Sequence, residues 1–375
     1  MRSEFRIGLL TAAVVMLAAC GGKKDEAADA APKPEDKVLF VYNWSDYIGE
    51  TTIADFEAKT GVKVTYDVFD SNEVLETKLL AGRTGYDVVV PSASFLERQI
   101  QAGVFMQLDK TKLPNLVNMD PEIMSRVAKH DPGNEHSINY LWGTTGIGYN
   151  PDMVKKALGT DTIDSWSAIF DPAIAKKLAK CGISMLDAPS EVLDSALIYL
   201  GRDPNSEKAE DLAAAEELLM KVRPYVRYFH SSQYINDLAT GEICVALGWS
   251  GDVLQARDRG AEAEKPVNVA YSVPKEGAII WFDMLAIPAD APHPGNAHAF
   301  LDFMMDPAVI AGVSDYVAYA NGNAASLPLV SDDVKNDPSV YPTEEVKKNL
   351  HAHLAESQEF SRDLNRAWTK VRTGQ

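Results

Sequence analysis

The chain is poor in positive charge, in cysteine and in long apolar runs. Its 375 residues hold 36 lysines and arginines against 54 aspartates and glutamates, so the net charge is −18 at pH 7. This balance argues against binding the phosphate backbone of nucleic acids by charge. It favours a cationic partner, although excess acid more often serves solubility alone. The apolar run from Ile7 to Ala19 is too short to span a bilayer.

Motifs for catalysis and metal binding are also missing. The seven histidines form no H-E-x-x-H pattern, and His351 and His353 are expected at the surface. The glycine-rich stretch from Gly143 to Gly148 has the wrong order for a dinucleotide fingerprint, so we expect a turn or a crossing between domains there. Ser250 follows Gly248-Trp249, but Asp252 stands where a nucleophile elbow needs glycine. The sequence therefore predicts no enzyme, no cofactor and no metal.

The N-terminus is typical of an export signal. Arg2 and Arg6 accompany the apolar run, which ends in Leu17-Ala18-Ala19-Cys20 and resembles the lipobox of bacterial lipoproteins. We expect cleavage before Cys20 and lipidation of its thiol, with plain cleavage as the alternative. Residues 20–37 lack apolar periodicity and predict a flexible tether. The predicted location is the periplasm, with the lipid as the membrane contact.

Cys181 and Cys244 remain once Cys20 carries lipid. An exported compartment is oxidising enough to join them, and two free buried thiols are the alternative.

From Val38 onward, short β-rich runs alternate with helical stretches. Residues 38–42, 62–68 and 87–90 read as strands, and residues 52–60, 73–81 and 95–102 read as helices. Further strands are expected at 243–247, 269–273 and 284–287, and further helices at 212–222 and 297–305. This alternation predicts an α/β fold with mostly parallel sheets. Polar stretches at 129–135 and 257–265 are candidate crossings between domains, which would place a ligand cleft between two lobes.

Acids lie beside aromatics in three predicted strand ends or loops. Trp44 precedes Asp46 and Tyr47, Trp249 precedes Asp252, and Trp281 precedes Asp283. Carboxylates bind ammonium groups through charge-assisted hydrogen bonds, and aromatic faces add cation–π attraction of roughly 0.5 to 2 kcal/mol each. Core or lobe packing is the better explanation of any one such cluster, but three together predict a site for an alkyl chain that bears amines.

Longer motifs connect these clusters to a known family. They are Y-N-W-S-D-Y at 42–47, Y-D-V-F-D-S-N-E-V-L-E at 66–76, V-V-V-P-S-A-S-F-L-E-R at 88–98, Y-F-H-S-S-Q-Y-I-N-D at 228–237 and R-A-W-T-K-V at 366–371. With these motifs, the sequence from about Val38 to its end closely resembles the periplasmic polyamine-binding proteins of bacterial ABC importers. The putrescine-binding branch is the most similar.

The resemblance implies a two-lobed periplasmic-binding-protein fold (type II), each lobe a mostly parallel sheet flanked by helices. The implied divisions of the chain are a signal peptide (1–19), a tether (20–37), the first lobe (38–141 and 261–331) and the second lobe (142–260 and 332–375). It implies a monomer that closes by hinge motion on putrescine or spermidine and delivers it to ABC permease subunits. A sensor of the same fold is the alternative. The resemblance also supports the Cys181–Cys244 disulfide.

The resemblance also implies ligand-binding roles for the residues at matching positions. Asp252 and Asp283 would hold one ammonium group, with Glu191 and Asp46 at the other end. The methylene chain would lie along aromatic walls, and hydroxyls would add polar contacts: Trp44, Trp249, Trp281, Tyr47, Tyr319, Ser45, Ser92 and Ser231.

Departures from the family leave the ligand open. Trp281 is typical of spermidine-type sites, and His353 replaces a leucine of the putrescine branch; both favour a longer ligand. Ser45-Asp46, Ser94 and Ala188 match the putrescine branch instead. Putrescine or spermidine preference and inner or outer membrane anchoring stay undecided.

Overall fold

The computed structural model describes residues 35–375, of which Asp36–Gln375 form one compact unit. The predicted signal peptide, Cys20 and most of the tether lie outside the described residues. Among the described residues, no helix is both long and apolar enough to cross a membrane.

A mixed sheet forms the centre of the molecule, with strands in the order β2-β1-β3-β9-β4-β7-β5-β6. β8 and β10 pair with β4, and β11 pairs with β9. The strands are β1 (Val38–Trp44), β2 (Lys63–Phe69), β3 (Val88–Val89), β4 (Ser137–Tyr149), β5 (Ile183–Met185), β6 (Tyr228–Phe229), β7 (Val245–Trp249), β8 (Ala270–Ser272), β9 (Ala278–Ala286), β10 (Ala320–Asn321) and β11 (Leu350–Ala352). We call β1, β2 and β3 the first half of the sheet and β5, β6 and β7 the second half.

Parallel pairing within each half confirms the predicted βαβ alternation. β1 pairs in parallel with β2 and β3, and β5 pairs in parallel with β6 and β7. Because the carboxyl ends of parallel strands meet at one edge, the loops that follow these strands gather there.

β4 connects the two halves. Its earlier residues, from Ser137 to Thr144, pair with β9, and its later residues, from Thr145 to Tyr149, pair with β7. Of the two alternatives predicted for Gly143–Gly148, the turn is wrong, because these glycines lie inside a long buried strand. The crossing between domains stays a prediction, and β4 changes its partner from β9 to β7 within this stretch. A Cβ atom at Gly143 would come within 2.8 Å of the Trp281 ring, so close packing rather than a turn requires this glycine.

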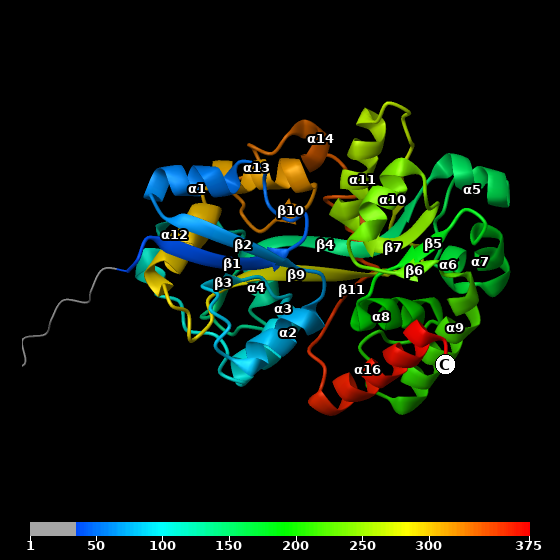
Figure 1. Ribbon diagram of the computed structural model, residues 1–375, viewed down its shortest axis with the longest axis horizontal. Coiled ribbons are helices and arrows are strands. Elements are labelled where there is room, and N and C mark those ends of the chain that lie inside the picture. Colours follow the sequence, from blue (N-terminus) through cyan, green and yellow to red (C-terminus); the bar gives the residue numbers. More distant parts are fainter. Residues whose placement is uncertain (1–34) are drawn as a thin grey trace, which may run out of the picture. The chain divides into compact units, whose positions relative to one another are not determined.

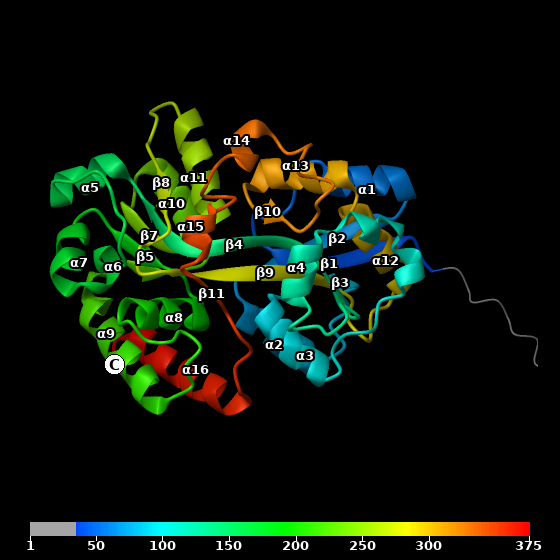
Figure 2. The ribbon, with the colours of Figure 1, turned by 180° about the vertical axis from the view of Figure 1, so that it is seen from behind.

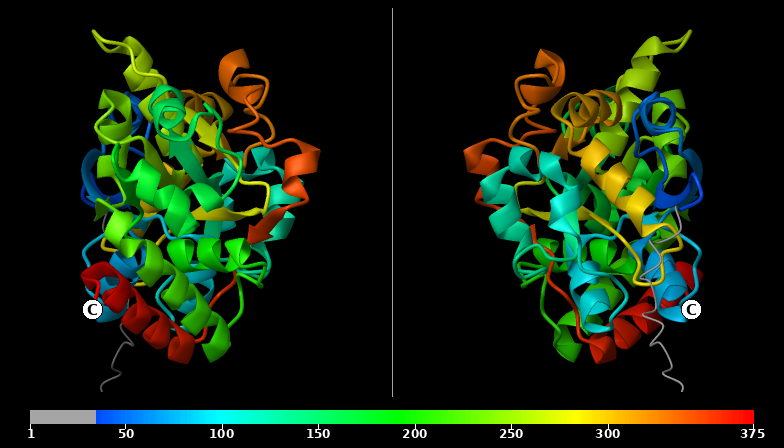
Figure 3. Two further views of the ribbon diagram at one scale, coloured as in Figure 1. Left: turned by 90° about the vertical axis from the view of Figure 1, so that its right-hand side faces the viewer. Right: turned by 90° about the vertical axis from the view of Figure 1, so that its left-hand side faces the viewer.

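Helices cover both faces of the sheet (Figures 1 and 2). On one face lie α1 (Thr52–Thr60), α10 (Gln233–Thr240), α11 (Ser250–Glu262) and α13 (Pro307–Val317). On the other lie α2 (Asn72–Ala81), α3 (Ala93–Gln101), α8 (Pro189–Tyr199), α9 (Ala209–Val222) and α16 (Gln358–Thr373). Figure 3 shows α16, which carries the C-terminus, beside α9.

The remaining helices are short or peripheral. They are α4 (Pro121–Val127), α5 (Pro151–Leu158), α6 (Ser167–Phe170), α7 (Pro172–Leu178), α12 (Pro294–Met304), α14 (Asp332–Lys335) and α15 (Glu344–Lys347), with 3-10 turns at Lys110–Lys112, Pro114–Asn118 and Arg223–Tyr225. Four helices, α4, α5, α7 and α13, begin at Asp-Pro or Asn-Pro, where the acid or amide caps backbone N–H groups and proline fits the first turn.

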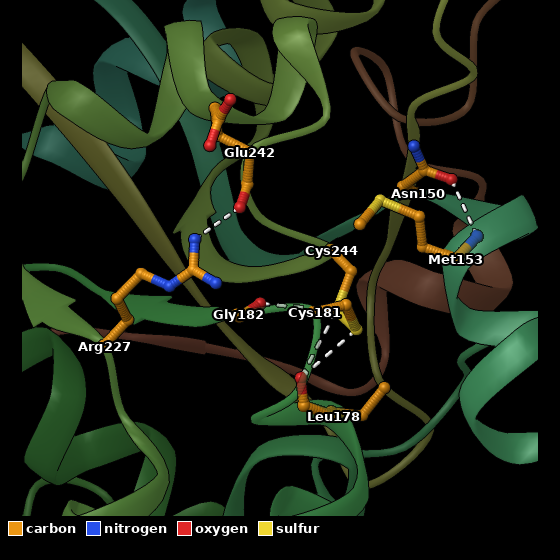
Figure 4. The surroundings of a disulfide bond; sticks show 8 residues. All are labelled: Asn150, Met153, Leu178, Cys181, Gly182, Arg227, Glu242 and Cys244. Carbon is orange, nitrogen blue, oxygen red and sulfur yellow. Dashed lines mark hydrogen bonds between the residues drawn. A yellow bond between two sulfur atoms is a disulfide. The ribbon is translucent and has the colours of Figure 1, made fainter.

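A disulfide joins Cys181, after α7, to Cys244, before β7, as Figure 4 shows. The two Cα atoms are 5.4 Å apart, an ordinary spacing for a disulfide. The expectation of a bridge between these cysteines is confirmed.

Candidate functional site

A cavity lies where the loops of both halves of the sheet meet. Part of it is continuous with solvent. Its lining comes from the ends of β1, β2, β6 and β7, the starts of α2, α3, α8 and α11, the middle of β9, and residues next to β10 and β11. The lining residues are Trp44, Ser45, Tyr47, Phe69, Asp70, Asn72, Glu73, Ser92, Ser94, Phe95, Ala188, Ser190, Glu191, Ser231, Trp249, Asp252, Trp281, Asp283, Tyr319 and His353.

Asp252 is buried in the first turn of α11, where the helix dipole favours a negative charge. The hydroxyls of Tyr234 and Tyr319 each donate a hydrogen bond of 2.7 Å to its carboxylate. Burial raises the pKa of Asp252 to about 7, although the hydrogen bonds from both tyrosines oppose the rise. The carboxylate is thus held in a fixed position, but it lacks a cation of its own inside the cavity.

Asp283 is buried in β9 and also lines the cavity. The Ser92 hydroxyl donates a hydrogen bond of 2.5 Å to this carboxylate, and the Asn72 side chain donates one of 2.9 Å to the same hydroxyl. Burial raises the pKa of Asp283 to about 7, and the Ser92 hydrogen bond opposes the rise. Burial, then the charges of Asp283 and Asp252, raise the pKa of the Tyr47 phenol, and the Tyr47 ring packs against Tyr319, whose hydroxyl donates a hydrogen bond to Asp252.

Glu191 belongs to a second group of charges. It lies in the first turn of α8, and the Thr145 hydroxyl donates a hydrogen bond of 2.5 Å to it. Burial raises the pKa of Glu191 to about 7, while that hydrogen bond and the charge of His353 oppose the rise. An elongated ligand with a cationic group at each end would meet carboxylates at both ends.

Aromatic rings form the walls between these groups. The Trp44 ring, at the end of β1, meets the Trp249 ring, at the end of β7, edge to face with centroids 5.4 Å apart. Tyr319 packs against both Tyr47 and Trp281, with centroids 5.1 Å and 5.4 Å away. The indole Nε1 of Trp281 is buried without a hydrogen-bond partner. Burial against such walls stabilises each methylene group of a ligand by about 0.8 kcal/mol.

Eleven of the twelve predicted ligand residues line this cavity, and Asp46 does not. Asp46 has a left-handed backbone (φ 53°), and its exposed carboxylate forms a 2.7 Å ion pair with Arg259 of α11. The carboxylate of Asp46 is therefore paired with Arg259, and Asp46 does not line the cavity.

Sequence reasoning missed several lining residues. Phe69 ends β2, and Asp70, Asn72 and Glu73 follow it, all inside the motif at 66–76. That position at a strand end is the signal that could have found them.

The structure also corrects the predicted position of His353. It was expected on the surface, but its side chain is only 11% exposed and lines the cavity, and His351 is half-buried in β11. Within residues 35–375, no group of three or more His, Cys, Asp or Glu side chains could hold a metal ion.

A cavity at the strand ends of a helix-flanked sheet is where α/β folds commonly bind small molecules. The family model for bacterial extracellular solute-binding proteins matches residues 51–343, and the chain belongs to this family.

Relatives cover almost the whole chain. It is 56% identical over 342 residues to the putrescine-binding periplasmic protein PotF of Escherichia coli K12, covering 91% of this chain and 92% of that protein. It is 54% identical over 348 residues to the putrescine-binding periplasmic protein SpuD of Pseudomonas aeruginosa UCBPP-PA14, covering 92% and 95%. A solved Listeria monocytogenes structure, provisionally assigned to a spermidine/putrescine ABC transporter, matches with a TM-score of 0.81 and 32% identity, covering 91% of this chain and all of that one.

Proposed function

We propose that this protein captures putrescine, spermidine or both in the periplasm and delivers them to the permease of an ABC importer. The observation that carries the proposal is the pair of buried carboxylates, Asp252 and Asp283, in an aromatic cavity that offers them no ammonium or guanidinium group. The putrescine-binding names of relatives more than half identical to this chain support it, and they favour transport over sensing.

In this proposal Asp252 and Asp283 hold one ammonium group of the ligand, and Glu191 accepts hydrogen bonds from the other end. The indoles of Trp44, Trp249 and Trp281 enclose the methylene chain together with Tyr47 and Tyr319, and Ser45, Ser92 and Ser231 supply hydroxyls. Asp46 takes no part in ligand contact, because Arg259 occupies its carboxylate.

The two halves of the sheet would belong to two lobes that close on the ligand. β8 still pairs with Ile147–Tyr149 near the second half, later in the chain than the expected boundary at 260/261. We therefore place the return of the chain within β9, so that β4 and β9 are two of the strands that would bend as the lobes open.

The export signal and Cys20 complete the proposal. A lipid on Cys20 would anchor a monomer to a membrane, and the tether would leave the binding domain free to reach the permease.

Calorimetric titration of the purified protein, stripped of bound amines, tests this function. Putrescine, cadaverine, spermidine and spermine are compared side by side. One-to-one binding of one or two of them is expected. Folded protein that binds none of the four contradicts the proposal.

A further inference from the structure

His353 lies in the segment after β11 and joins the cavity lining at the Glu191 end. Its Nδ1 atom lies 2.7 Å from Oδ2 of Asp194, a buried residue of α8. Because an ionised carboxylate only accepts hydrogen bonds, Nδ1 carries a proton and donates it to Asp194. This contact engages one of the two ring nitrogens.

The other ring nitrogen, Nε2, is buried and has no hydrogen-bond partner. Without a proton, Nε2 can accept a hydrogen bond from an ammonium group of a ligand. With a proton, it adds a positive charge to the wall of the cavity. The same side chain can thus attract or repel an amine, depending on one proton.

Charges on four segments surround the ring. α8 contributes Asp194 and Glu191, and the segment of His353 itself contributes Glu356, whose Oε1 atom lies 3.9 Å from Nε2. Glu73 of α2 lies close enough to Glu191 to raise the pKa of that carboxyl. A cationic side chain also lies beside these acids: Arg98 of α3 pairs with Glu76 and lies 3.9 Å from Glu356.

The neighbouring carboxylates raise the pKa of His353 by more than burial lowers it. Burial lowers the pKa of His353, but the charge of Asp194 and its hydrogen bond, followed by Glu356 and Glu191, bring the pKa to about 9. The ring is therefore positively charged at neutral pH.

We propose that His353 is a specificity residue controlled by a proton: its protonated ring takes the place of one ligand charge and restricts the cavity to diamines, and loss of the Nε2 proton admits a third amine. The inference rests on the proposed polyamine function. It would make this cavity a putrescine site at neutral pH despite Trp281, and it reverses the preference for a longer ligand that the sequence alone indicates for His353.

Calorimetry of the full protein with putrescine and spermidine tests the inference at about pH 7 and about pH 9.5, on either side of the titration. Three variants are compared with the unchanged protein. His353→Gln removes the charge and keeps a donor for Asp194, His353→Lys keeps a charge at both pH values, and His351→Gln is a matched control two residues away and outside the lining. Ionisation of the ligand affects all proteins equally and cancels when their selectivities are compared.

At pH 7, His353→Gln is expected to shift the preference towards spermidine at least tenfold, since one charge is removed from a buried wall. The unchanged protein should approach the selectivity of that variant at pH 9.5, and His353→Lys should not. Equal selectivity of the unchanged protein and His353→Gln at pH 7 overturns the inference. If His353→Gln fails to fold, equal selectivity of His353→Lys and the unchanged protein at pH 9.5 overturns it. Absence of any amine binding would refute the proposed function instead.

Discussion

The carboxylate of Asp46 and the guanidinium of Arg259 lie 2.7 Å apart, and they join the loop after β1 to helix α11. Gln255, one turn earlier on α11, also donates a hydrogen bond to the backbone oxygen of Asp46. These contacts connect segments from the two halves of the sheet beside the cavity. They favour an arrangement in which the halves are close together.

Breaking this ion pair should speed ligand release. Both side chains are more than a third exposed, so we expect about 0.2 to 1 kcal/mol, or up to about fivefold in the dissociation rate. Stopped-flow measurements on Asp46→Asn, Arg259→Gln and the double variant give the coupling directly. Additive effects of the two substitutions would show that the pair does not hold the halves together.

Asp252→Asn should weaken amine binding by about 2 to 5 kcal/mol, because an ammonium group would be left buried without its carboxylate. Titration calorimetry measures the loss. Asp258→Asn is the matched control, since Asp258 lies on the same helix and is exposed. Unchanged affinity of Asp252→Asn would remove this residue from the site.

Putrescine binding should weaken as the pH falls below about 7. Burial raises the pKa of Asp252, Asp283 and Glu191 to about 7, so each takes up a proton near that pH in the empty cavity. An ammonium group needs the ionised form, and affinity therefore falls by up to about tenfold per pH unit for each carboxyl that must lose its proton. Calorimetry in buffers of different ionisation enthalpy should detect proton release on binding at neutral pH. A flat affinity between about pH 5.5 and about pH 8 would contradict this reading.

Trp281→Phe should shift the preference towards putrescine by about two- to fivefold, the loss expected when an indole face is replaced by a smaller ring. The ratio of spermidine to putrescine affinity is the measurement. Trp166→Phe serves as control, because Trp166 is buried outside the cavity lining. A ratio that Trp281→Phe leaves unaltered would show that the indole has no part in length selection.

Replacing both Cys181 and Cys244 with alanine should destabilise the fold by roughly 2 to 4 kcal/mol, since the bridge closes a long loop in the unfolded chain. Urea unfolding measures this change. Neither cysteine lines the cavity, so amine affinity of the folded variant should stay the same. An unfolding midpoint equal to that of the unchanged protein would contradict the expected contribution.

Local patterns predicted most elements that position the cavity. The helix expected at 52–60 has those bounds in the structure, and the strand expected at 62–68 spans Lys63–Phe69. Alternating apolar residues and helix caps act within a few residues, so one sequence is enough to read them.

Features that depend on distant contacts could not be read. His353 is held in its buried position by a hydrogen bond to Asp194, a residue 159 positions earlier. No local sequence pattern marks that pairing. Gly146 and Gly148 look like turn residues, but they lie in β4, where a Cβ atom would collide with Tyr271 or Val253.

Gly143 and Gly251 leave room for two aromatic rings that line the cavity. A Cβ atom at Gly143 would collide with the Trp281 ring, and one at Gly251 would collide with the Tyr319 ring. Neither glycine lines the cavity, yet each sets how far an aromatic wall can withdraw from the ligand. A single methyl group behind the wall would therefore narrow the slot. New ligand preferences could arise in this scaffold while every residue that touches the amine stays the same.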